Sequence, residues 1–101
     1  IELCNVLDER KKFAISNQLL RSATSIGANV REAQNAESES DFVHKLKIAA
    51  KEAEETMYWL DLCLYSPTYP NTENEKTELL SIIRIINKII GTIKTKHQLA
   101  N

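Results

Sequence analysis

The stretch that decides the fold is residues 72–97, which read TENEKTELLSIIRIINKIIGTIKTKH. Apolar residues recur in it at helical spacing. Acidic side chains gather at its start and basic side chains at its end, as the helix dipole favours. Thr72 and Glu75 have the spacing of a capping box. The stretch therefore predicts a long helix that begins just after Thr72.

The apolar arc of this helix is wider than the core of one chain requires. Its polar residues form a single narrow stripe, made of Ser81, Arg84, Lys88, Thr92 and Thr95. A helix inside a bundle needs an apolar arc of roughly 100°, and burial of one exposed isoleucine is worth ~2 kcal/mol. We therefore expect copies of the chain to cover the surplus isoleucines by self-association. The alternative is that an N-terminal segment outside this sequence covers them.

Two more helices are expected in the first third of the chain. Residues 1–8 read as the last two turns of a helix, and residues 8–12 read as a charged loop. Because the first residue is Ile1 and not methionine, we expect the native N-terminus to lie ahead of it. From Leu19 to about residue 36, apolar residues return at helical spacing and predict the second helix.

A third helix is predicted to begin at Ser38. Ser38 and Asp41 have capping-box spacing, and apolar residues recur at helical intervals over residues 42–64. Both prolines lie in residues 66–71, which read as a loop. The predicted fold is all-α, an antiparallel up-down four-helix bundle that forms one domain over residues 1–101.

Composition excludes several classes of protein. The 101 residues include 13 basic and 14 acidic side chains, two glycines and two prolines. So few turn-forming residues disfavour a small β-sandwich, and no apolar run is long enough to span a membrane. Autonomous nucleic-acid-binding domains usually carry a basic excess, which this chain lacks. Cys4 and Cys63 have no metal-binding or redox spacing, so we expect reduced thiols in a cytoplasmic protein.

No pattern in the chain indicates an enzyme. A glycine-rich phosphate loop and a nucleophile elbow are both missing from the sequence. Asp41 and His44 form an acid-x-x-His pair, but a di-iron bundle needs two such pairs on different helices. We therefore predict no catalytic residue, no cofactor, no metal and no small-molecule substrate.

The second helix contributes candidates for assembly. Gly27 costs about 1 kcal/mol relative to alanine in a helix interior, and close contact with a neighbouring helix would offset this cost. Asn29 either fixes the register of an interface by a hydrogen bond or lies half exposed to water. The predicted assembly residues are Ile26, Gly27, Asn29, Ile82, Ile85, Ile89 and Ile93.

Two local basic patches are the candidate contacts to nucleic acid. One lies in the first loop and the other on the last helix, where either could attract phosphates although the chain as a whole has a net charge of -1. Their residues are Arg10, Lys11, Lys12, Arg84 and Lys88.

The second helix also carries a family resemblance. Residues 18–33, QLLRSATSIGANVREA, resemble the bacterial four helix bundle protein family, as do AES at 36–38 and EAEET at 52–56. This family is also described as the ribosomal RNA intervening-sequence protein family. The resemblance covers nearly the whole chain from the second helix onward. Ala33 stands where a glycine often follows the motif glutamate, so the helix should continue through it.

The resemblance implies an up-down four-helix bundle that assembles as a homopentamer. A related protein, the accessory protein of diversity-generating retroelements, binds nucleic acid and a reverse transcriptase. That relative is markedly basic, whereas five copies of this chain would carry a charge of about -5 and repel phosphate at long range. We therefore predict a self-assembling scaffold or adaptor associated with ribosomal RNA or an RNA-associated protein. Direct RNA or DNA binding through the basic patches is the alternative.

Overall fold

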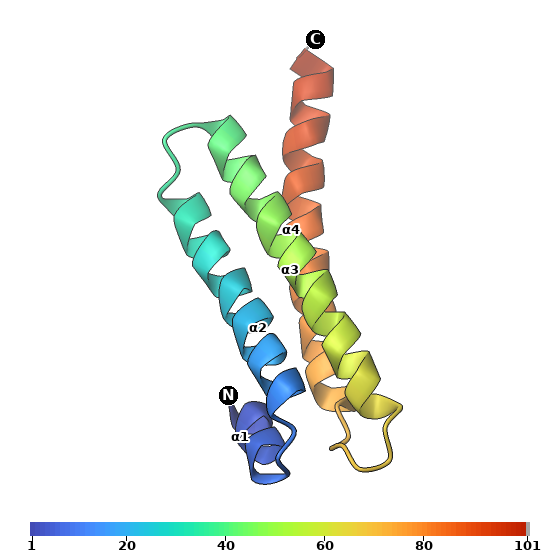
Figure 1. Cartoon of the computed structure of the whole chain (residues 1–101). Coiled ribbons are helices and arrows are strands. Elements are labelled where there is room, and N and C mark those ends of the chain that lie inside the picture. The colour runs from blue at the N-terminus through green and yellow to red at the C-terminus, as the bar shows by residue number, and fades with distance from the viewer. Residues whose placement is uncertain (101) are drawn as a thin grey trace.

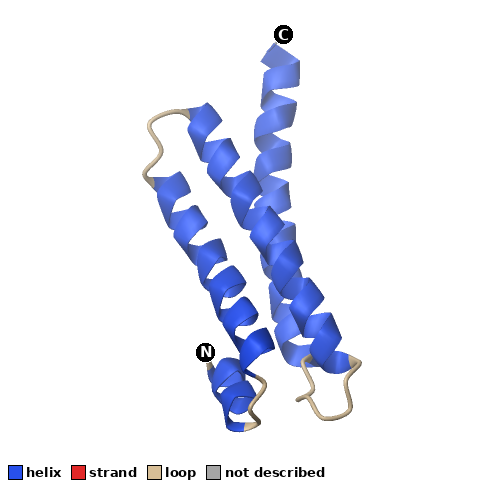
Figure 2. Ribbon diagram, in the orientation of Figure 1, coloured by secondary structure: helices blue, strands red, loops and turns tan. Residues whose placement is uncertain are grey.

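The computed structural model describes residues 1–100, which form helices joined by short loops (Figures 1 and 2). The helices are α1 (Glu2–Glu9), α2 (Phe13–Gln34), α3 (Glu39–Leu64) and α4 (Glu73–Ala100). No strand occurs in this part of the chain, and the predicted all-α four-helix class is confirmed. None of the helices described is long and apolar enough to cross a membrane.

A tight turn reverses the chain between α1 and α2. The backbone N–H of Lys12 donates to the carbonyl of Leu7 at 2.8 Å, and Lys11 adopts a positive φ of 60°. This is the Schellman ending of a helix, in which the left-handed position is usually glycine. The loop predicted at residues 8–12 is shorter than expected, because α1 continues to Glu9.

The start of α3 lies where the sequence predicts it. The Ser38 hydroxyl oxygen accepts a hydrogen bond from the backbone N–H of Asp41 at 3.0 Å. This bond satisfies one of the amides that the first turn of a helix leaves without a partner. The acidic residues of this turn, Glu39 and Asp41, lie at the positive end of the helix dipole.

The capping box predicted for α4 is wrong. The hydroxyl of Thr72 donates to the carbonyl of Leu60 at 2.7 Å, and over the described residues it accepts no hydrogen bond from the backbone N–H of Glu75. The backbone N–H of Glu73 is satisfied by the side-chain oxygen of Asn71 at 2.9 Å. Thr72 is fully buried, so its hydroxyl finds the nearest acceptor in α3 and ties the start of α4 to the end of α3.

The three long helices run alternately up and down, with α3 between α2 and α4 (Figure 1). The most extensive packing is between α2 and α3, followed by that between α3 and α4. With only 8 residues, α1 packs against one end of α2. Over the described residues α2 and α4 make no close backbone contact with each other. The up-down order is therefore as predicted, but α1 covers only a short part of the bundle.

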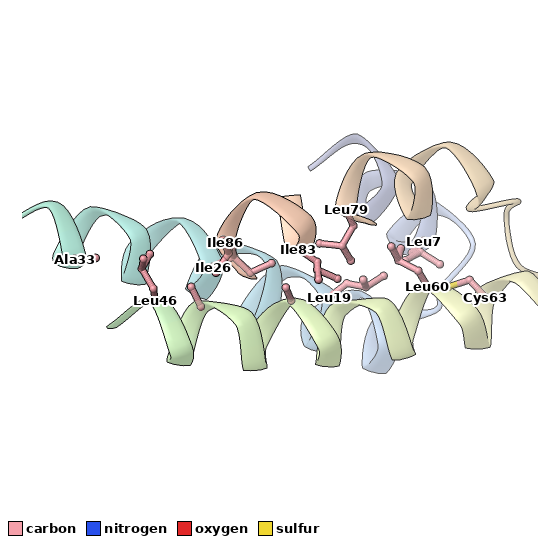
Figure 3. Packing of buried hydrophobic residues seen from close by; sticks show 12 residues of the cluster. Leu7, Leu19, Ile26, Ala33, Leu46, Leu60, Cys63, Leu79, Ile83 and Ile86 are labelled. Carbon is pink, nitrogen blue, oxygen red and sulfur yellow. The ribbon is translucent and has the colours of Figure 1, made fainter. Parts of the chain in front are cut away.

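The hydrophobic core draws on all four helices. Figure 3 shows Leu7, Leu19, Leu60 and Leu79, one from each helix, pointing toward one another near α1. Burial of each such side chain is worth about 1.5–3 kcal/mol. The full set of buried apolar residues is Leu7, Leu19, Ile26, Ala33, Leu46, Ala49, Ala53, Leu60, Cys63, Leu79, Ile83 and Ile86.

Polar contacts link α2 to α3 on the side of the core. The buried hydroxyls of Ser22 and Thr56 lie 2.8 Å apart. Closer to the solvent, the guanidinium of Arg21 contacts Glu55 and lies 3.3 Å from the carboxylate of Glu52. The hydrogen bond to Glu55 raises the pKa of Arg21. Exposed ion pairs contribute little to the stability of the folded chain. The buried hydroxyl pair therefore fixes the register of α2 and α3 more strongly than the ion pairs of Arg21 do.

Candidate assembly interface

One flank of α4 exposes three of the isoleucines predicted for assembly. Ile82, Ile85 and Ile89 are 42%, 59% and 39% exposed. They recur at intervals of three and four residues, so they lie on one side of the helix, next to the side that faces the core. Solvent exposure of three isoleucines in one row is unfavourable unless another surface covers them.

Two other predicted assembly residues are not part of this exposed flank. Ile26 is 8% exposed and belongs to the core of its own chain, because the side of α2 that carries it faces α3 and α4. Ile93 is half buried and lines a shallow depression with Phe42 and Ala36. Ile26 also lines a groove between α2 and α4, so a role for it between copies remains a prediction.

A groove runs between α2 and α4 beside the start of α1. Its volume is about 540 Å³. Its floor comes from α3 at Thr56 and Leu60, while Ile82 contributes to the α4 wall. Ile82 belongs both to this groove and to the exposed flank of α4, so the groove and the flank form one apolar area.

Gly27 lies in the α2 wall of this groove. A Cβ placed on Gly27 would meet nothing within 4 Å, so the helix contact predicted there is not made within the chain. The amide of Asn29 donates to the carbonyl of Ser25, on its own helix, at 2.8 Å, and the side chain is half buried. A role for either residue between copies remains a prediction.

The two basic patches lie on different parts of the molecule. Arg10 and Lys11 are exposed at the turn between α1 and α2, whereas the ammonium of Lys12 lies 4.8 Å from the centre of the Tyr69 ring. A cation over an aromatic face is held by the ring, so Lys12 is less available than its neighbours. Arg84 and Lys88 are exposed on the polar side of α4. They are four residues apart in α4, so they lie about one helical turn from each other.

The C-terminal part of α4 is tethered to the start of α3 by ion pairs. The ammonium of Lys96 lies 3.5 Å from one carboxylate oxygen of Glu39, and His97 contacts the other oxygen. The hydrogen bond from His97, together with the charge of Lys96, lowers the pKa of Glu39. These side chains are exposed, so the tether is weak.

The acid-x-x-His pair of α3 is not part of a metal-ligating cluster in the described part of the chain. Asp41 and His44 lie in its first turns, and His97 is engaged by Glu39 instead of approaching His44. Within residues 1–100 no three His, Cys, Asp or Glu side chains gather in a way that could hold a metal ion.

The two cysteines are close to each other in the fold but are not bonded. Both are free thiols in the structure. The thiol of Cys4 donates to the carbonyl of Ser16 at 3.7 Å, and the hydroxyl of Ser16 donates back to the carbonyl of Cys4 at 3.3 Å. Burial raises the pKa of the Cys63 thiol, and the nearby Cys4 adds to this effect. Cys63 is therefore a packing residue of the core.

Sequence reasoning missed two residues on the exposed flank of α4. Glu78 and Lys96 lie on the same side of the helix as the exposed isoleucines, one toward each end. The signal was present in the sequence, because both fit the alternation of four and three residues set by Ile82, Ile85 and Ile89. A pattern defined by apolar residues alone does not include the charged residues at the ends of such a row.

These features define a small all-α helical bundle whose unusual property is an uncovered apolar flank. The profile of the family described as 23S rRNA-intervening sequence protein matches residues 1–92. The chain belongs to this family.

Comparison with solved structures gives a consistent result. The crystal structure of a protein of unknown function from the S23 ribosomal protein family, from Bacteroides thetaiotaomicron, is 41% identical in sequence. The alignment covers 88% of this chain and 88% of that chain, with a TM-score of 0.81. A search of curated proteins finds no match.

Proposed function

We propose that this chain is a non-enzymatic, self-assembling helical bundle that acts in the cytoplasm as a scaffold or adaptor, in association with ribosomal RNA or the ribosome. The observation that carries the proposal is the row of exposed isoleucines on α4. A surface of this kind marks an interaction site in a protein that is otherwise well packed. The link to ribosomal RNA comes from family membership.

Self-assembly is tested first, by sedimentation of the full chain over a wide range of concentrations. The proposal expects a species heavier than the 11.5 kDa monomer, and the family resemblance implies five copies. Ile85→Ser should shift the species toward the monomer, because Ile85 is the most exposed of the three isoleucines. Thr95→Ser, on the polar side of α4, is the control. A monomer at every concentration would contradict the proposal.

The association with RNA is tested by purification of the tagged chain from its native cells, followed by sequencing of bound RNA and identification of bound proteins. Enrichment of ribosomal RNA or ribosomal proteins over a tag-only control is expected. If the chain is recovered with neither ribosomal RNA nor ribosomal proteins enriched, the association with the ribosome is contradicted. The scaffold role would then depend on the sedimentation result alone.

Direct binding of RNA or DNA is a second candidate, and one observation favours it. Residues 79–100 contain no acidic residue, so the exposed Arg84 and Lys88 lie in a locally positive part of a chain whose net charge is -1. Phosphate contacts weaken steeply as salt rises. A gel shift with a 23S ribosomal RNA fragment should therefore disappear with salt and with Arg84→Glu/Lys88→Glu. No shift at low salt would exclude this candidate.

A further inference from the structure

Ion pairs at the two ends of α3 and α4 show how these antiparallel helices are aligned. The ammonium of Lys76 lies 2.7 Å from the carboxylate of Asp61 at one end, and that of Lys96 lies 3.5 Å from Glu39 at the other. Between these contacts the helices lie side by side (Figure 1). Because both helices rise equally per residue, the middle of α3 lies level with residues 84–90 of α4.

A shallow depression between α3 and α4 marks one side of this helix pair. Asp61 of α3 and Thr77 of α4 both line the depression, so both face this side. Arg84 and Lys88 follow Thr77 by seven and eleven residues, which is about two and three helical turns. They therefore lie in line with Thr77 on the same side, and both are exposed.

Two lysines of α3 lie level with these α4 cations. Tyr58 precedes Asp61 by three residues and lies next to it on the helix surface. Lys51 and Lys47 precede Tyr58 by seven and eleven residues, again about two and three turns, and both are exposed. The two helices thus gather four cations on one side. We call this group the α3–α4 basic face, and it consists of Lys47, Lys51, Arg84 and Lys88.

Few carboxylates oppose the charge of the α3–α4 basic face. The carboxylate of Asp61 is neutralised by Lys76, and Glu55, farther round α3, is engaged by Arg21. Glu54 remains as an exposed acidic residue on this side of α3. The part of α4 level with it contributes none, because residues 79–100 contain no acidic residue. The face is therefore locally positive, although the whole chain has a net charge of -1.

Tyr58 adds an aromatic ring at one end of the α3–α4 basic face. Its side chain is 55% exposed, and the ring meets that of Trp59 edge to face, with the centroids 5.1 Å apart. A base can stack on such a ring only when it is not paired within a duplex. Cations in rows with an aromatic ring at their end therefore fit a single strand, whose phosphates contact the cations and whose base stacks on the ring.

We propose that the α3–α4 basic face binds a single-stranded segment of RNA, with phosphates on its four cations and one base on Tyr58. This inference rests on the direct binding of RNA given above as the second candidate function, and it adds the surface and the kind of strand. It joins residues of α3 to the basic patch of α4. It leaves Arg10 and Lys11, at the turn between α1 and α2, outside the site.

Fluorescence anisotropy of a labelled oligouridine, titrated with the full chain at several salt concentrations, tests the cations. Lys47→Gln/Lys51→Gln should weaken binding about tenfold. It should also reduce the slope of log affinity against log salt by about 1.4, because each phosphate contact to a single strand contributes about 0.7. Arg84→Gln/Lys88→Gln should have the same two effects, since both pairs contact the same strand.

The matched control for charge is Arg10→Gln/Lys11→Gln. It removes two exposed cations at the turn between α1 and α2, so it changes the net charge equally and should leave the salt slope unchanged. Circular dichroism of every variant shows whether the helices are intact.

Substitution of Tyr58 tests the stacking. Tyr58→Ala should weaken binding of oligouridine about tenfold without changing the salt slope, because a stacked base releases no counterions. Tyr58→Phe keeps the ring and should bind as the unchanged chain does. Phe13→Ala is the control, because Phe13 is also 55% exposed but lies on α2. An RNA duplex of the same length should bind more weakly than the single strand and should not respond to Tyr58→Ala.

The outcomes separate this inference from the proposed function. Weakening by the variants of both helices and by Tyr58→Ala supports the single-strand site. Sensitivity to the α4 pair alone, or a duplex that binds as tightly as the single strand, overturns the site but leaves direct binding of RNA standing. Equal competition by polyglutamate overturns it and assigns the face to an acidic protein. No binding of RNA at low salt overturns both, and the scaffold role then depends on the sedimentation result.

Discussion

The buried hydroxyl pair between α2 and α3 allows a quantitative prediction about stability. The Thr56 hydroxyl oxygen lies 2.8 Å from that of Ser22 and 2.8 Å from the carbonyl oxygen of Glu52. Thr56 has one hydroxyl hydrogen, and a carbonyl oxygen can only accept. Both contacts are used when Thr56 donates to Glu52 and Ser22 donates to Thr56. The other acceptor near Ser22 is the carbonyl of Leu19, at 3.4 Å.

Removal of one partner should therefore cost more than removal of both. Thr56→Val keeps the shape of the side chain but leaves the fully buried Ser22 hydroxyl with only its long contact, at a cost of about 1–3 kcal/mol. Ser22→Ala removes a donor while Thr56 keeps Glu52, at a cost of about 1 kcal/mol. The double variant leaves no unpaired hydroxyl, so its cost should be smaller than the sum by about 1 kcal/mol.

Urea unfolding followed by circular dichroism measures these costs, at a protein concentration where all variants have the same association state. Thr77→Val is the control, because the exposed Thr77 donates only within α4, to the carbonyl of Glu73 at 3.0 Å. It should change the free energy of unfolding by no more than about 0.5 kcal/mol. If the two single costs add in the double variant, Ser22 and Thr56 do not interact, and the register of α2 and α3 has another cause.

Three further predictions concern other parts of the fold. Leu7→Ala should lower the free energy of unfolding by about 2–5 kcal/mol, because Leu7 is 0% exposed and holds α1 on the core; a much smaller loss in urea unfolding would show that α1 contributes little. Gly27→Ala should raise the free energy of unfolding by up to about 1 kcal/mol, because a Cβ at this position meets nothing within 4 Å. Gly91 in α4 has equally open surroundings, so Gly91→Ala should have the same effect. A loss of stability at either position would contradict the open space around the Cβ. Since His97 lowers the pKa of Glu39, this carboxylate stabilises the folded chain above its unfolded pKa, and the contribution disappears as the pH falls through the lowered folded pKa. Urea unfolding of Glu39→Gln should thus show a loss relative to the unchanged chain at neutral pH and none in strong acid, and an equal loss at both would exclude ionisation as the cause.

Helix positions could be predicted because their causes are local. The Ser38 hydroxyl caps an amide three residues away, and prolines in residues 66–71 interrupt the helical pattern. The same reasoning was wrong at Thr72, whose hydroxyl donates to the carbonyl of Leu60, a residue that is distant in sequence and adjacent only in the fold. A polar side chain at a helix start can bond to any donor or acceptor that the fold brings near, and a sequence pattern describes only the local ones.

The candidate interface could be predicted only in part. The isoleucine-rich composition of α4 indicated more apolar surface than one core covers, and Ile82, Ile85 and Ile89 are indeed exposed. Ile26 has the same chemistry and a comparable helical spacing, yet it is buried. The difference arises from the helices that lie across from each residue, which periodicity does not specify.

The amino-acid sequence alone determined that this protein is helical, where each helix lies within a few residues, and that α4 carries surplus apolar surface. These properties follow from hydrogen bonds within one turn and from the spacing of apolar residues along one helix. Only the tertiary structure decided which isoleucines stay exposed and that a groove remains between α2 and α4. The reason is that burial depends on the neighbours that packing supplies, and over the described residues α3 packs against both α2 and α4 while α2 and α4 make no close backbone contact with each other.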